Sequence, residues 1–149
     1  MERNKERAAP AAMKGKEMDE KEQLFGKFIK EKRLNDPREL TLKDVSNALG
    51  LSLSMLSDIE QGRRKAFDDD RIIKFCEYLN LDENALREMR DYAAFCKHKI
   101  PADIEETMLH SEIGSMARHA LRLANEGYGD EEDWKKFIWQ LEEKKRNDA

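Results

Sequence analysis

The 149-residue chain carries 40% Asp, Glu, Lys and Arg, only 7% aromatic residues and a net charge of −4. Its length allows one domain or two small ones, and this composition is typical of a soluble, strongly helical protein with a modest core. No apolar run is long enough to span a membrane and no signal peptide is recognisable, so we expect a cytoplasmic protein without a membrane partner.

The charge is unevenly divided along the chain. Residues 1–67 hold 15 Lys and Arg against 12 Asp and Glu, whereas residues 68–149 hold 13 against 20. A basic first half is compatible with binding to nucleic acid, and we expect the acidic half to face away from it.

Residues 1–18 contain almost no large apolar side chains, which predicts a flexible N-terminal tail. A helix is predicted over residues 19–34, because its apolar residues recur at helical spacing. These residues are Leu24, Phe25, Phe28 and Ile29.

Two short helices at a tight turn are predicted between Thr41 and Lys65. Thr41 can cap the first helix, and Gly50 can end it because glycine adopts the left-handed backbone at little cost. Ser52 or Ser54 can cap the second helix, which ends at Gly62. The predicted buried stripe of the first helix is Leu42, Val45 and Leu49, and the apolar positions of the second are Leu53, Leu56 and Ile59.

The spacing within this segment has a mechanical explanation. Two helices that cross steeply at a short turn approach closely, so a small residue, Ser46, is needed near the crossing. Gly50 permits the sharp turn, and Leu56 and Ile59 hold the second helix against the first. This is the helix-turn-helix pattern, whose second helix enters the DNA major groove. The alternative is an ordinary helical hairpin, but the polar second helix and the basic run after it favour DNA binding.

The segment TLKDVSNALGLSLSMLSDIEQGRR resembles the helix-turn-helix of the Cro/repressor (XRE-like) family of bacterial and phage regulators. The resemblance covers about Leu24 to Leu86 and implies an all-α, five-helix, lambda-repressor-like domain that binds double-stranded DNA. We assign it to residues 19–99. It also implies that Arg33 on the first helix forms a structural ion pair with Glu60. The connection between Arg33 and Thr41 is longer than in the family pattern.

The start of the second helix supplies the residues that we expect to contact base edges. Leu53 can contact a thymine methyl group, and a serine hydroxyl can donate or accept. Asp58 can accept from a cytosine amine, or it can pair with Arg63 or Arg64 within the chain. The predicted base-contacting residues are Leu53, Ser54, Ser57 and Asp58.

Hydroxyls at helix starts and the cations after the second helix are predicted to contact DNA phosphates. These residues are Thr41, Lys43, Ser52, Arg63, Arg64 and Lys65.

Two further helices are predicted before Pro101, capped by Asp68 and Asp82. Cys76 and Cys96 have apolar neighbours, which predicts buried free thiols in a reducing compartment. No metal-ligand spacing, phosphate-binding loop or catalytic arrangement is present, so we expect neither an enzyme nor a cofactor.

Residues 100–149 are predicted to form a small three-helix C-terminal dimerisation segment. Its apolar stripes need more cover than about fifty residues can provide. Docking onto the preceding helix is one explanation, and a homodimer interface is the one we favour, because a two-fold operator is read by a dimer. The predicted interface residues are Ile113, Met116, Ala120, Leu121, Trp134, Phe137, Ile138 and Leu141.

The layout of the tail, with its I-P-x-D-I junction and D-W-x-x-F-I motif, also resembles repressors inactivated with the help of an ImmA/IrrE-type metallopeptidase. We therefore expect a repressor that binds DNA as a homodimer, with such a metallopeptidase as a further partner. Two alternatives are an antitoxin whose tail neutralises a toxin and an adaptor that has lost DNA binding. Leu53 and Met55 favour the adaptor, because many relatives carry polar base readers at these positions.

Overall fold

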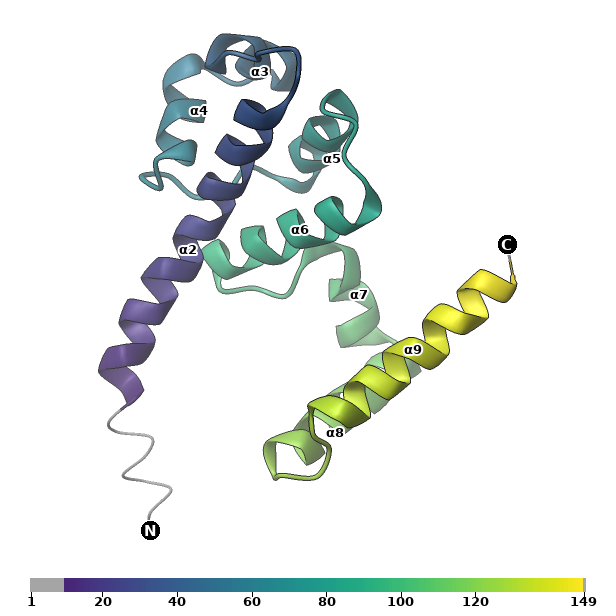
Figure 1. The fold of residues 1–149 in the computed structure, drawn as a ribbon. Helices are drawn as coiled ribbons and strands as arrows, with labels where there is room; N and C mark the ends of the chain where they lie inside the picture. The colour runs from purple at the N-terminus through teal and green to yellow at the C-terminus, as the bar shows by residue number, and fades with distance from the viewer. Residues whose placement is uncertain (1–9, 149) are drawn as a thin grey trace. The chain divides into compact units, whose positions relative to one another are not determined.

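The computed structural model describes the backbone of residues 10–148 and the side chains of residues 20–148. Over this range the chain contains helices and no strands (Figure 1). It divides into two compact units, Met1–Asp103 and Ile104–Ala149. No helix in the described range is both long and apolar enough to cross a membrane.

The first described helix, α2 (Pro10–Asn35), begins earlier than the predicted start at residue 19. Residues 1–9 of the predicted N-terminal tail lie outside the described residues. Gly26 is buried where α2 crosses α4 (Leu53–Glu60), and a Cβ atom there would lie 2.3 Å from the carbonyl oxygen of Ile59. The two helices can therefore pack this closely only with glycine at this position.

The helix-turn-helix consists of α3 (Leu42–Leu49) and α4, and both begin at the predicted caps. The Thr41 hydroxyl accepts a hydrogen bond from the amide of Asp44, whose carboxylate accepts one from the amide of Thr41. Gly50 ends α3 with a φ of 68°, in the left-handed region, and Ser52 caps α4. The local signals in the sequence thus predict this pair of helices correctly.

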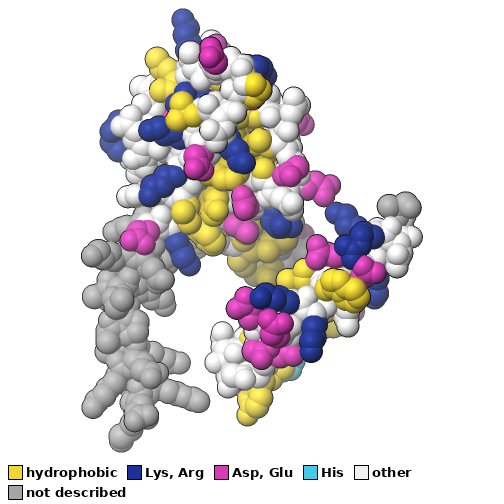
Figure 2. Space-filling model, viewed as in Figure 1, with side chains coloured by type: hydrophobic (Ala, Val, Ile, Leu, Met, Phe, Trp, Pro, Cys, Tyr) yellow, Lys and Arg dark blue, Asp and Glu magenta, His cyan; other side chains and the backbone are white. Residues whose placement is uncertain are grey.

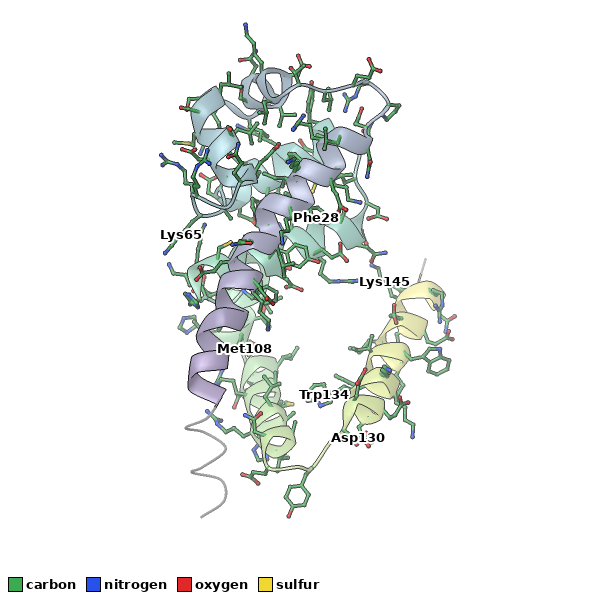
Figure 3. The ribbon with its side chains drawn as sticks, turned by 60° about the vertical axis from the view of Figure 1, so that its left-hand side comes forward. Phe28, Lys65, Met108, Asp130, Trp134 and Lys145 are labelled. Carbon is green, nitrogen blue, oxygen red and sulfur yellow. The ribbon has the colours of Figure 1, made fainter. Side chains whose placement is uncertain are left out.

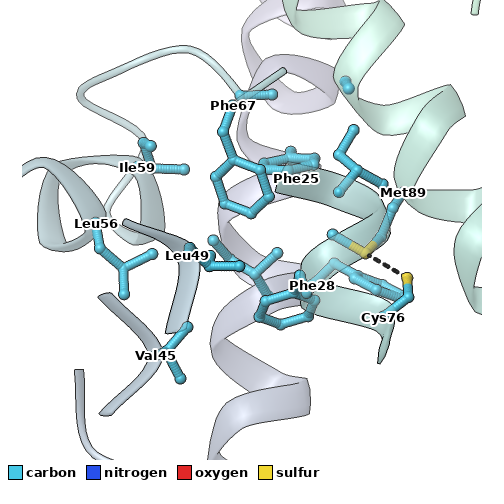
Figure 4. Packing of buried hydrophobic residues seen from close by; sticks show 14 of the residues in the cluster. Phe25, Phe28, Val45, Leu49, Leu56, Ile59, Phe67, Cys76 and Met89 are labelled. Atoms are coloured by element: carbon cyan, nitrogen blue, oxygen red, sulfur yellow. Dashed lines mark hydrogen bonds between the residues drawn. The ribbon is translucent and has the colours of Figure 1, made fainter. Parts of the chain in front are cut away.

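Two more helices complete the first unit: α5 (Asp69–Tyr78), capped by Asp68, and α6 (Glu83–Lys97), capped by Asp82. The core joins side chains from all five helices and the loop after α4 (Figure 4). Phe25 and Phe67 pack edge to face with ring centroids 4.9 Å apart. Cys76 and Cys96 are buried and free, as predicted, and the Cys76 thiol lies 3.5 Å from the sulfur of Met89.

The second unit contains α8 (Glu112–Asn125), α9 (Glu131–Asn147) and most of α7 (Ala102–His110). Gly114 lets α8 approach the end of α7, because a Cβ there would lie 2.0 Å from the carbonyl oxygen of Thr107. Gly114 is the only buried residue in the described range 104–148. Figure 2 shows hydrophobic side chains at the surface of this unit, among acidic and basic ones.

Candidate nucleic-acid interface

The four predicted base-contacting residues lie on one side of α4. Leu53 and Ser54 are exposed, and Ser57 and Asp58 are partly buried. The opposite side carries Leu56, Ile59 and Glu60, which are all buried. Helical spacing thus separates the face that holds α4 in the domain from the face that is open to a ligand.

Three of these four residues have side-chain partners within the chain, and the Ser54 hydroxyl lies 3.4 Å from that of Ser52. Asp58 accepts from Arg63, with 3.1 Å between Oδ1 and Nη2, so the structure contains the intramolecular pair that the sequence left as an alternative. Both side chains remain partly exposed, and a pair of this kind is weak enough to exchange for another partner. The Ser57 hydroxyl accepts from Nε2 of Gln61 at 3.2 Å.

Gln61 was missed by the sequence analysis. It is exposed, caps the C-terminus of α4 and lies one turn after Ser57. Its amide offers a donor and an acceptor beside the predicted base-contacting residues. Its position one helical turn after Ser57 was the available sequence signal.

The predicted phosphate-contacting residues are all exposed. The hydroxyl oxygens of Thr41 and Ser52 accept hydrogen bonds from backbone amides at 3.1 and 3.2 Å. An accepting hydroxyl keeps its own proton to donate, so capping a helix and donating to a phosphate oxygen are compatible.

The loop after α4 gathers the basic residues. Arg63, Arg64 and Lys65 line an open pocket of about 170 Å³ together with Glu22, Gly62 and Cys96. Lys65 extends from the surface of this loop (Figure 3). The loop therefore places three cations directly beside the end of the exposed α4 face.

Arg33 and Glu60, the pair that the family resemblance implies, meet in the interior of the first unit. Nε and Nη2 of Arg33 donate to the two carboxylate oxygens of Glu60 at 2.8 and 2.9 Å. Nη1 donates to the carbonyl oxygen of Leu40 at 3.1 Å. Both charged residues are more than nine-tenths buried, and the hydrogen bond to Glu60 raises the pKa of Arg33. One guanidinium thus joins α2, α4 and the end of the loop before α3.

The predicted dimerisation residues occupy two positions in the C-terminal unit. Ala120, Trp134 and Phe137 line a groove of about 260 Å³ between α8 and α9. Figure 3 shows Trp134 on the side of α9 that faces α8. The other five are exposed in the C-terminal unit: Ile113, Met116, Leu121, Ile138 and Leu141.

Comparison with known proteins finds one family match, and it lies within the first unit. Residues 29–86 match the model of a helix-turn-helix family. The matched segment contains α3, α4 and α5, and it supports the resemblance to the Cro/repressor family and a DNA-binding regulator. It is less than half of the chain and leaves the C-terminal unit without a family match. Neither the comparison with curated proteins nor the one with solved structures found a match.

Proposed function

We propose that this protein is a sequence-specific transcriptional repressor that binds a two-fold operator as a homodimer in the cytoplasm. The observation that carries the proposal is the helix-turn-helix itself, in which a second helix with an exposed polar face is followed by three exposed cations. Such a face fits the DNA major groove, and such cations fit the phosphates beside it.

The roles of individual residues follow from where they lie. Leu53, Ser54, Ser57 and Asp58 would contact base edges, with Asp58 exchanging Arg63 for a cytosine amine. The surrounding hydroxyls and cations would bind phosphates and so set the position of α4 without reading sequence. These are Thr41, Lys43, Ser52, Arg63, Arg64 and Lys65.

Dimerisation is supported by the uncovered apolar surface of the C-terminal unit. Ile113 and Met116 on α8 are 69% and 66% exposed, and Ile138 and Leu141 on α9 are 51% and 48% exposed. Burying a fully exposed side chain of this size is worth about 1.5–3 kcal/mol, so covering each of these partly exposed side chains would contribute roughly half of that. Two copies of the same unit would cover one another's stripes in a symmetric contact.

The same uncovered surface favours a second candidate function, an antitoxin. In that case the C-terminal unit would bind a toxin rather than a second copy, while the first unit still bound DNA.

For the repressor we further propose a metallopeptidase partner that inactivates it. The turn between α8 and α9 offers a site for cleavage, because it contains Gly127 and Gly129, both with positive φ, and an exposed Tyr128.

The experiment that tests the proposal is selection of bound sequences from a random pool of DNA duplexes with the full chain. The expected result is an enriched sequence with two-fold symmetry. An enriched sequence without symmetry would favour DNA binding by a monomer. It would also fit a chain whose first unit binds DNA while its C-terminal unit binds another protein. If no sequence is enriched, sequence-specific binding is refuted, and the hypothesis of an adaptor that has lost DNA binding is favoured.

A further inference from the structure

The connection between α2 and α3 is tied to α5 by a single arginine. Nε and Nη2 of Arg38 each donate to the Asp36 carboxylate at 2.9 Å, and Nη2 also donates to the carbonyl oxygen of Tyr78 at 2.7 Å. The guanidinium carbon lies 4.7 Å from the centroid of the Tyr78 ring. Tyr78 is the last residue of α5, so this contact spans forty positions of sequence.

Asp36 orients the side chain of Arg38 for its contact with Tyr78. Its carboxylate also accepts from the backbone amide of Arg38 at 2.9 Å, which closes a local turn. The Asp36 side chain is only 7% exposed, and the hydrogen bonds from Arg38 lower its pKa. The carboxylate therefore holds both the backbone and the guanidinium of Arg38 in one arrangement.

The end of the connection is held from the other side. Leu40 is buried, and its carbonyl oxygen accepts from Arg33 at 3.1 Å. Between the two anchors Glu39 has a φ of 55°, a left-handed conformation that a residue with a Cβ rarely adopts. Such a backbone persists when the contacts around it determine it, as they do here.

A second arginine holds the other end of α3 to the same helix. Nε of Arg71, near the start of α5, donates to the carbonyl oxygen of Leu49 at 3.2 Å. Arg38 and Arg71 thus join α3 to α5 at both ends, with the start of α3 beside the end of α5. Besides its packing on α4, α3 is therefore held by two arginines that lie outside the helix-turn-helix.

We infer that Arg38 is a positioning residue for DNA binding: it fixes the start of α3 against α5 and so determines where Thr41 and Lys43 meet the phosphates. The inference rests on the proposed DNA-binding function. It explains how α3 keeps a fixed position although the connection before it, between Arg33 and Thr41, is longer than the family resemblance leads us to expect. Arg38 acts here through its bonds to Asp36 and Tyr78, and its charge is neutralised by Asp36.

The test is the variant Asp36→Ala in the full chain, because charge and position predict opposite results for it. Removing a negative charge near DNA would by itself strengthen binding. If Arg38 acts by positioning, operator binding weakens about threefold to tenfold, as for the loss of one hydrogen-bonded contact. The slope of log affinity against log salt concentration should also become shallower by about one, which corresponds to the loss of one phosphate contact. A loss of overall stability would not change this slope.

Two further variants control the experiment. Glu88→Ala makes the same change in charge at an exposed site on α6, and its binding should equal or slightly exceed that of the wild type. Tyr78→Leu removes the ring under Arg38 without a change in charge, and its binding should weaken as in Asp36→Ala.

Hydrogen exchange separates failure of the inference from failure of the proposed function. In Asp36→Ala the amides of residues 42–45 should exchange faster while those of α4 keep the wild-type rate. Unchanged exchange at residues 42–45, or Asp36→Ala binding as tightly as Glu88→Ala, would overturn the role of Arg38. If the wild type binds no duplex while exchange responds as expected, Arg38 does fix the start of α3, but the DNA-binding proposal fails and the inferred role in DNA binding fails with it.

Discussion

The ion pair between Arg33 and Glu60 makes a quantitative prediction for the variant Glu60→Gln. The substitution keeps the size of the side chain and removes its charge. In the wild type both carboxylate oxygens accept from the guanidinium, at 2.8 and 2.9 Å. The amide of glutamine has one oxygen, so one of the two contacts is lost and an N–H group faces an N–H group.

The expected magnitude follows from burial. Arg33 is 9% exposed and Glu60 is 7% exposed, so water cannot replace the lost carboxylate. Leaving one charge of a buried pair without its partner costs about 3–5 kcal/mol. In the variant Arg33 still donates to Leu40 and can donate to the glutamine amide oxygen. We therefore expect a loss in the free energy of unfolding at the lower end of this range, about 3 kcal/mol. For a domain of this size this corresponds to a fall in melting temperature of roughly 10–20 °C.

The assay is urea unfolding of the full chain, followed by circular dichroism, with Asp58→Asn as the matched control. Asp58 also pairs with an arginine, but the side chains of that pair are 35% and 62% exposed, so its loss should cost no more than about 1 kcal/mol. The double variant Arg33→Met with Glu60→Met should recover much of the loss, because no buried charge remains. A Glu60→Gln protein that unfolds within about 0.5 kcal/mol of the wild type would refute this reasoning.

Three further predictions concern single side chains. Ser54→Ala should change the preference among operators by about 1–3 kcal/mol, measured by competition binding, and an unchanged ranking would exclude a base contact. Arg64→Ala should weaken all duplexes alike and reduce the salt slope by about one, whereas a loss confined to the operator would contradict a phosphate contact. Burial raises the pKa of the Cys76 thiol from its usual 9.0 to about 11, so the protonated thiol stabilises the fold below pH 9 and that contribution is lost as the pH rises through 11. Alkylation of Cys76 at pH 8 should therefore follow unfolding, and rapid alkylation of the folded chain would contradict its burial.

Much of the first unit could be predicted because its signals are local. A hydroxyl or carboxylate at the start of a helix caps it wherever the helix packs, so Thr41, Ser52, Asp68 and Asp82 could be identified from sequence alone. The left-handed backbone of Gly50 could also be predicted from sequence, because a glycine between two short helices commonly ends the first of them.

Features that depend on long-range approach were not predictable in this way. The need for glycine at position 26 arises from the backbone of α4, more than thirty residues away. Nothing near Arg38 in the sequence indicates Tyr78, because that contact is set by the packing of α3 on α5. The partner of Asp58 could not be chosen either, since two arginines follow it closely and an exposed pair is decided by small differences in energy.

The central claim, operator binding by a homodimer formed through the C-terminal unit, is tested most directly by sedimentation of the full chain with its selected duplex. The test variant is Ile138→Glu with Leu141→Glu, and the control Lys136→Gln with Gln140→Glu makes the same change in charge at exposed polar positions of α9. The wild type and the control should place two chains on each duplex. The test variant should be monomeric and bind at least about a hundredfold more weakly, because the second contact is no longer intramolecular. A test variant that still dimerises and binds as tightly as the wild type would contradict the account.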